Sequence, residues 1–132
     1  MSTPLPPNPG IPAVPFTFRA RLKRVVDGDT QVYVIDFRAH RYGDVSVRLV
    51  GVNTPEKIGA TRDAGLAATA YSLAWLVAAG TDEWPLVIET TLDKDDKYGR
   101  LLGKIWRVSD QRCLNADLVA DGQALEYWGG TR

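Results

Sequence analysis

The sequence predicts an α+β fold that is mainly β, a small barrel of five strands with two or three helices. Apolar and polar residues alternate over residues 16–35 and again over 45–52, which is typical of half-buried strands. An uncharged, alanine-rich stretch of helical length covers residues 64–80. Two further apolar runs, 86–91 and 101–108, flank a polar loop.

The strands are predicted first. Two strands lie within residues 16–35 and meet at the turn Asp27-Gly28-Asp29-Thr30. A third strand, 45–52, follows a loop over 38–43 and stops at Asn53-Thr54-Pro55, because a proline disfavours the helical conformation in the residue before it. We expect these three strands to form an antiparallel meander.

A helix is predicted next, capped by Asp63, running to about residue 79 and ended by Gly80. We expect it to pack on the sheet through an apolar face made of Leu66, Ala70, Leu73, Ala74 and Val77. Strands over 86–91 and 101–108 follow, and then a short helix over 115–121 that Gly122 closes. This order of elements fits a five-stranded Greek-key barrel of the oligonucleotide-binding (OB) type.

Composition bounds the rest of the chain. The 132 residues suffice for one hydrophobic core, and we expect a single, monomeric domain over residues 16–132. A flexible arm of 15 residues, six of them prolines, precedes this domain. The net charge of zero gives no overall attraction for a polyanion, so binding of nucleic acid would depend on local basic patches. Residues 64–80 are too weakly apolar for a membrane span, and we expect no membrane partner. The start of the chain lacks the pattern of a secretory signal, which favours a cytoplasmic protein over a secreted mature one.

Two rare residue types carry little chemistry. Cys113, the only cysteine, can form no intramolecular bridge, and we expect a buried, inert thiol. His40, the only histidine, is expected at the surface. Its isolation argues against histidine-dependent nucleases and zinc hydrolases, which need clustered ligands.

Three segments carry residues suited to the hydrolysis of a phosphodiester. Arg48 and Arg100 offer planar, permanently charged guanidinium groups that match phosphate oxygens. The carboxylate of Glu56 can hold and deprotonate water. Asp29, with oxygens from the turn at Asn53 and Thr54, suits a hard cation such as calcium.

Each of these residues also has an ordinary explanation. Arg100 can be a turn arginine, Glu56 a solvated loop acid, and Asp27-Gly28-Asp29 only a hairpin turn. Their joint occurrence at strand ends and turns favours a site, because functional side chains are often mounted there on a rigid scaffold.

Four stretches together resemble the staphylococcal-nuclease (thermonuclease) family. The first three are Val25-Val26-Asp27-Gly28-Asp29-Thr30, Arg48-Leu49-Val50-Gly51-Val52-Asn53-Thr54-Pro55-Glu56 and Asp96-Lys97-Tyr98-Gly99-Arg100. A weaker similarity covers residues 114–122. The stretches follow one another in the family's order over residues 19–128, which is more specific than any one motif.

The resemblance implies a calcium-dependent nuclease that cleaves DNA and RNA to 3′-phosphates. Carried over by position, Arg48 and Arg100 would grip the phosphate, and Glu56 would position or deprotonate the attacking water. Asp29 would be the main metal carboxylate, with Asn53 as a side-chain ligand and Thr54 as a backbone ligand. Asp27 would orient that cluster without binding the metal itself.

The chain departs from the family at Asn53, where an aspartate is usual; the loss of one charge predicts weaker calcium binding. Lys97 and Tyr98 are candidates for contact with the substrate. Tyr127 and Trp128 are candidates for stacking on a base, and equally for the core or a lid. The basic residues Arg19, Arg21, Lys23, Arg24, Arg38 and Arg41 are either an electrostatic track or ordinary solvated surface.

The sequence therefore predicts a metal-dependent endonuclease of the thermonuclease type, acting on exposed or single-stranded DNA or RNA. The alternative is a catalytically silent OB-type module that binds nucleic acid or protein. The coexistence of Arg48, Glu56 and Arg100 favours the enzyme.

Overall fold

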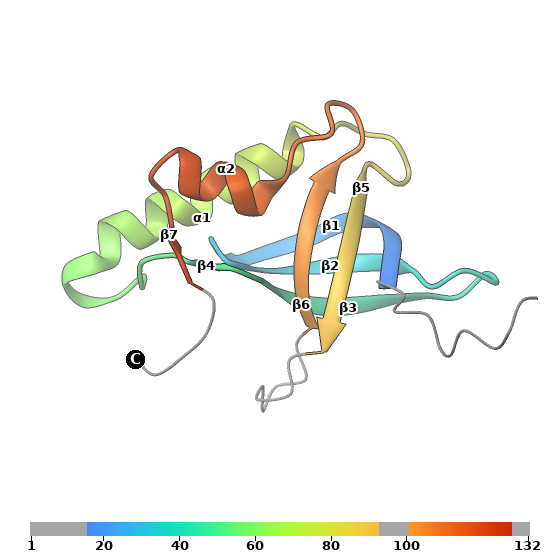
Figure 1. Ribbon diagram of the computed structural model, residues 1–132, viewed down its shortest axis with the longest axis horizontal. Coiled ribbons are helices and arrows are strands. Elements are labelled where there is room, and N and C mark those ends of the chain that lie inside the picture. The colour runs from blue at the N-terminus through green and yellow to red at the C-terminus, as the bar shows by residue number, and fades with distance from the viewer. Residues whose placement is uncertain (1–15, 93–100, 128–132) are drawn as a thin grey trace, which may run out of the picture.

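The structure is a computed structural model, and it describes residues 16–92 and 101–127. Five strands close into a barrel in the order β1-β2-β3-β6-β5 (Figure 1). The barrel strands and helices are β1 (Phe16–Asp27), β2 (Thr30–Asp36), β3 (Tyr42–Leu49), α1 (Arg62–Val77), β5 (Leu86–Leu92), β6 (Leu101–Arg107) and α2 (Leu114–Ala120). The predicted fold, a mainly β barrel of the OB type with helices, is confirmed.

Pairing follows from the alternation in the sequence. Strands β1, β2 and β3 form the predicted antiparallel meander. Strand β3 then pairs in parallel with β6, where Val47 lies opposite Leu101, and the barrel closes where β1 pairs with β5. The parallel pair places the end of β3 beside the start of β6, two segments more than 50 residues apart in the sequence.

Some short elements were not predicted. Strand β3 covers Tyr42–Leu49 instead of the predicted 45–52, because a turn at Val50 and Gly51 ends it before β4. A two-stranded ladder joins β4 (Val52–Asn53) to β7 (Leu125–Glu126), and a 3₁₀ turn (Gly59–Thr61) precedes α1. Two-residue strands are stabilised by partners far away in the chain, so local alternation gives no sign of them.

The predicted apolar face of α1 is wrong. Leu66, Leu73 and Val77 are exposed, whereas Gly65, Ala68, Ser72, Trp75 and Leu76 face inward. The helix is apolar on most of its circumference, so its periodicity does not select a face. Small residues let the helix approach the barrel closely, and the Ser72 hydroxyl donates a hydrogen bond to the Gly28 carbonyl (2.7 Å).

The predicted cap of α1 is also corrected. The helix begins at Arg62 with Thr61 as its N-cap, and Asp63 lies within the first turn. A carboxylate there still interacts favourably with the helix dipole. The short second helix starts one residue before the predicted position.

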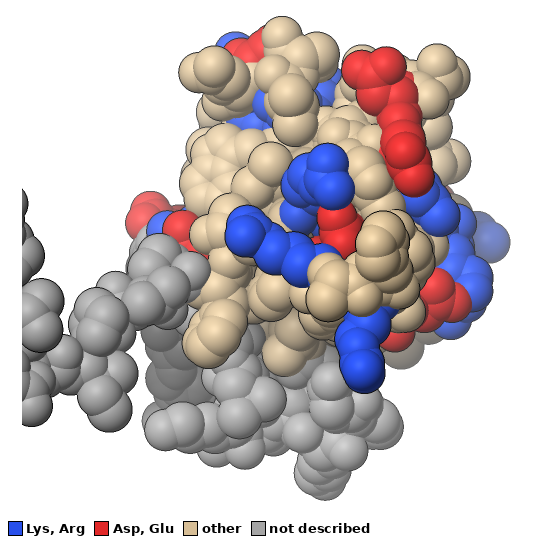
Figure 2. Space-filling model, turned by 90° about the vertical axis from the view of Figure 1, so that its right-hand side faces the viewer, with Lys and Arg blue, Asp and Glu red and all other residues tan. Residues whose placement is uncertain are grey.

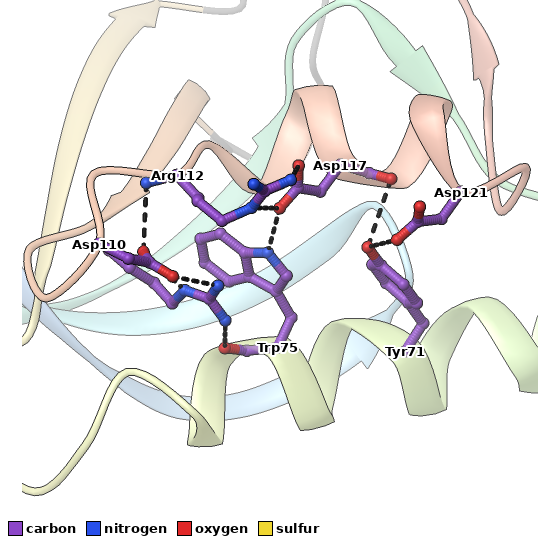
Figure 3. Close-up of polar contacts among 7 residues, drawn as sticks. Tyr71, Trp75, Asp110, Arg112, Asp117 and Asp121 are labelled. Carbon is purple, nitrogen blue, oxygen red and sulfur yellow. Dashed lines mark hydrogen bonds and ion pairs between the residues drawn. The ribbon is translucent and has the colours of Figure 1, made fainter.

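Polar side chains brace the two helices, which lie side by side on one face of the barrel (Figures 1 and 3). Asp117 of α2 accepts two hydrogen bonds from Arg112 (2.8 and 2.7 Å) and one from the indole of Trp75 on α1 (2.8 Å). The Tyr71 hydroxyl donates to Asp121 (2.5 Å). Burial, together with that carboxylate, raises the pKa of Tyr71, so the hydroxyl remains a donor at neutral pH.

Other expectations concern single residues. His40 is exposed, as predicted, whereas Cys113 is only half-buried rather than buried, because it lies just before α2 at the rim of a cavity. Within residues 16–92 and 101–127, no helix is long and apolar enough to cross a membrane.

Candidate active site

The candidate site lies at one end of the barrel, where β3 ends beside the β1–β2 turn. Thr30, the first residue of β2, is the register partner of Arg48. This pairing brings Asp29 next to Arg48, although 18 residues separate them in the sequence. The structure therefore brings together the first two of the three predicted segments.

Arg48 is held from one side by backbone. Its Nη1 donates to the carbonyls of Leu49 (3.0 Å) and Val52 (3.2 Å), which lie on the turn that follows β3. Its Nη2 lies 3.5 Å from Asn53 Oδ1 and 3.7 Å from Asp29 Oδ2. Both terminal nitrogens therefore face oxygen atoms: Nη1 faces the two backbone carbonyls, and Nη2 faces the Asn53 amide and the Asp29 carboxylate.

Asp29 is buried and its carboxylate is oriented by two donors. Oδ2 accepts from the backbone N–H of Thr54 (3.1 Å), and Oδ1 accepts from the Thr30 hydroxyl (3.2 Å). The bond from Thr54 links the β1–β2 turn to the segment after β4. Asp29, Asn53 and Thr54, which are the three predicted metal ligands, thus lie together.

The turn that carries Asp29 is supported from inside the barrel. Besides its bond from Ser72, the Gly28 carbonyl accepts from the fully buried side chain of Gln31 (2.9 Å). Gly28 itself has no room for a side chain, because a Cβ would lie 2.9 Å from Ala68 Cβ and from Thr54 Cγ2. The glycine of the first motif is therefore required by close packing.

Asp27 pairs with a residue that sequence reasoning missed. Lys57 Nζ lies 3.0 Å from Asp27 Oδ1 and donates to the Val26 carbonyl (2.6 Å). The contact links the first motif to the residue after Glu56. The only signal in the sequence was a lysine beside the second motif, which is too common to be informative.

Glu56 lies on an exposed segment whose backbone is fixed. Its carbonyl accepts from the Thr61 hydroxyl (2.8 Å). A Cβ on Gly65 of α1 would lie 2.5 Å from that carbonyl oxygen, so α1 packs directly against the backbone of Glu56. Within residues 16–92 and 101–127 the Glu56 carboxylate has no hydrogen bond or ion pair, which leaves it available for water.

Asn115 is a second residue that sequence reasoning missed. Its amide group donates to the carbonyls of Val50 (2.8 Å) and Gly103 (3.0 Å), and its Oδ1 accepts from the N–H of Ile105 (3.2 Å). The side chain therefore holds α2, β6 and the turn that fixes Arg48 together. The weak similarity over residues 114–122 pointed to this segment but not to this role.

Several predicted site residues lie outside the described residues, namely Arg100, Lys97, Tyr98 and Trp128. Tyr127 is described and half-buried, and its backbone N–H donates to the Gly51 carbonyl (2.8 Å). That bond positions the end of the described chain beside the turn that follows Arg48.

Two cavities flank this turn. One, of about 330 Å³, lies between Asn53-Thr54-Pro55 and the residues that follow α2. The other, of about 480 Å³, is lined by Val50, Trp106, Cys113 and the apolar side of α2. Asp29 and Arg48 line neither of these two cavities.

The oxygen atoms that Asp29, Asn53 and Thr54 offer are of the types that bind a hard cation. Carboxylate, amide and carbonyl oxygens are the ligands that calcium prefers. Asp29 is the one carboxylate among the three, and the described part of the chain holds no group of three acidic, histidine or cysteine side chains suited to a metal. The residues therefore fit a calcium ion held with less charge than a site with two carboxylates would supply.

Comparison with known proteins agrees with this arrangement. No curated protein matches the chain. The family model described as staphylococcal nuclease homologue matches residues 46–130, which include Arg48, Glu56 and Arg100. This match covers more than half of the 132 residues. The chain therefore belongs to the staphylococcal nuclease homologue family, whose members are nuclease-type or nucleic-acid-binding modules.

Proposed function

We propose that the protein is a calcium-dependent nuclease that hydrolyses DNA or RNA to 3′-phosphate products. The observation that carries the proposal is the fixed guanidinium of Arg48, which two backbone carbonyls hold 3.7 Å from a buried carboxylate. A guanidinium immobilised in this way can stabilise charge that develops on a phosphate with little reorganisation.

The reaction requires a water molecule and one P–O bond in line. Water attacks phosphorus opposite the P–O5′ bond, that bond breaks, and the products are a 3′-phosphate and a 5′-hydroxyl. Glu56 takes the proton that water loses, while the departing 5′-oxygen gains a proton from solvent. Arg48, and Arg100 with it, binds the equatorial oxygens as they gain negative charge.

Calcium supplies positive charge beside the phosphate when it is bound. Asp29, Asn53 and the Thr54 carbonyl would hold it. Asp27, paired with Lys57, keeps the β1–β2 turn and the Glu56 segment in fixed relation. Three segments of the chain thus contribute to one phosphate site.

Digestion of single-stranded DNA tests the proposal. We expect cleavage with calcium, none with chelator, and a loss of about 10²-fold for Glu56→Gln, a magnitude typical of general-base catalysis. Glu89→Gln on β5 is the matched control and should retain native activity. Cleavage that is insensitive to both chelator and Glu56→Gln would contradict the proposal.

The single carboxylate at the cation site favours one rival, a module that binds nucleic acid without cleaving it. One experiment distinguishes the nuclease from the binding module. The rival predicts that labelled single-stranded DNA binds in calcium and is recovered intact, whereas the nuclease converts it to fragments with 3′-phosphate ends.

Asn53→Asp is expected to lower the calcium concentration required for half-maximal activity by about tenfold, because the added charge lies next to Asp29. Calcium titration of initial rates measures the shift. Gln111→Glu, in the loop between β6 and α2, adds the same charge elsewhere and should leave the calcium requirement unchanged. Equal calcium requirements for Asn53→Asp and the native chain would show that the asparagine does not weaken the site.

A further inference from the structure

A layered cluster of aromatic and cationic side chains lies at the opposite end of the same sheet face from Arg48. The rings of Tyr42 and Trp84 stack with centroids 5.6 Å apart and an interplanar angle of 18°. The guanidinium of Arg21 lies 4.7 Å from the Trp84 ring centroid, and that of Arg19 lies 5.6 Å from it. Tyr42 nevertheless remains 56% exposed, so it has ring surface available for a further partner.

The cluster draws on three segments that are distant in the sequence. Arg19 and Arg21 come from β1, Tyr42 begins β3, and Trp84 lies in the loop before β5. Arg19 and Arg21 of β1 lie against the Trp84 ring, and Tyr42 of β3 stacks on it, so the cluster lies over the outer face of the meander. We define these four residues as the distal cluster.

The distal cluster shares its sheet face with the candidate site. Side chains alternate along a strand, so Tyr42, Asp44, Ser46 and Arg48 of β3 all point to the outer face. Arg48 is the sixth residue after Tyr42, which corresponds to about 20 Å along the strand. An extended chain bound at Arg48 can therefore follow β3 to the distal cluster.

Charge along this route favours a polyanion. Arg19 is paired with Asp36 (2.6 Å), and Lys23 is paired with Asp44, the acid that lies on the route. Within residues 16–92 and 101–127, the guanidinium groups of Arg21, Arg38 and Arg41 have no ion-pair partner. These three arginines outnumber the two acidic residues, Asp82 and Glu83, of the loop that leads to Trp84. The local surface thus retains positive charge although the chain as a whole is neutral.

The β2–β3 hairpin presents some of these cations. Arg38, Ala39 and His40 adopt φ values of 70°, 52° and 59°, a left-handed conformation that non-glycine residues rarely adopt. A hydrogen bond from the Phe37 N–H to the Arg41 carbonyl (2.9 Å) closes the hairpin. Several Lys and Arg side chains lie on the side of the molecule that carries this hairpin, with Asp and Glu side chains among them (Figure 2).

We propose that the distal cluster is a second binding site for single-stranded nucleic acid, about 20 Å from Arg48 on one continuous track. A base stacks on the exposed ring of Tyr42, while Arg21 and the hairpin arginines bind the flanking phosphates. A single strand suits this surface because its bases are free to stack, whereas those of a duplex are not. The inference rests on the proposed function, since it assigns the scissile phosphate to Arg48.

Binding should therefore depend on the length of the strand. Single OB folds bind about 4–16 nucleotides. We expect an oligothymidine of 16 nucleotides to reach both ends of the track and one of three nucleotides to occupy only the Arg48 end. Fluorescence anisotropy with chelator present measures binding without cleavage.

In this assay Tyr42→Ser is expected to weaken binding of the 16-mer by about tenfold, which is within the range for one stacked base. Binding of the 3-mer should be unchanged, and Tyr42→Phe should restore the native affinity because it keeps the ring.

Arg21→Gln should reduce the slope of log K against log salt by about 0.7, the value for one phosphate contact with a single strand. Lys104→Gln, which removes a charge on β6, should not alter that slope.

The outcomes separate this inference from the proposed function. Equal losses for the 16-mer and the 3-mer, or no loss in Tyr42→Ser, would overturn it and leave the cluster as a brace for the loop before β5. Binding of polyglutamate that depends on Tyr42, without binding of the 16-mer, would overturn it in favour of an acidic protein partner. Absence of cleavage in calcium with length-dependent binding intact would overturn the nuclease and retain the distal site.

Discussion

Arg48→Lys is expected to lower kcat/KM for single-stranded DNA by about 10³-fold, the upper range for loss of one fixed oxyanion donor. Lysine keeps the positive charge but has no planar fork. It cannot bind the carbonyls of Leu49 and Val52 while it also presents two donors to a phosphate. Initial rates over a range of substrate concentrations measure the effect.

Arg24→Lys is the matched control for this prediction. Arg24 is exposed on β1 and has no hydrogen bond or ion pair in the described part of the chain, so the substitution should leave activity at the native level. Urea unfolding of both variants separates a catalytic loss from a loss of fold. Activity of Arg48→Lys within tenfold of native would show that charge alone is sufficient at this position.

Asp117→Ala is expected to lower the free energy of unfolding by about 2–3 kcal/mol, because the indole N–H of Trp75 loses its buried acceptor. The ion pair with Arg112 contributes less, since that guanidinium is largely exposed. Urea denaturation followed by circular dichroism measures the change. Asp63→Ala, an exposed aspartate in the first turn of α1, should cost much less.

The same carboxylate makes stability depend on acid pH. Hydrogen bonds from Arg112, and after it Trp75, lower the pKa of Asp117 in the folded protein. A lowered folded pKa means that the stabilisation is complete above the unfolded value of about 4 and is lost as pH falls toward the folded value. The difference between native and Asp117→Ala should therefore shrink below pH 4. A constant difference down to pH 2 would show that the carboxylate is not responsible.

Local patterns predicted the elements of this fold well. Alternation indicated the strands of the meander, and Asp27 to Thr30 was recognised as a turn, whereas the strand that carries Arg48 ends at Leu49, before the end predicted from Pro55. Each of these features depends on neighbours in the sequence, through side-chain alternation and through backbone restriction. The order of the elements was then sufficient to indicate the barrel.

The sequence by itself therefore determined the five strands of the barrel, the barrel itself and the residue types of the candidate site. Only the tertiary structure decided which face of α1 is buried, that Lys57 meets Asp27, and that Asn115 secures the turn after Arg48. It alone also placed Tyr42 against Trp84, 42 residues further along the chain. The reason is the same in each case. These contacts depend on close packing and on hydrogen bonds between distant segments, and local periodicity in the sequence carries no information about them.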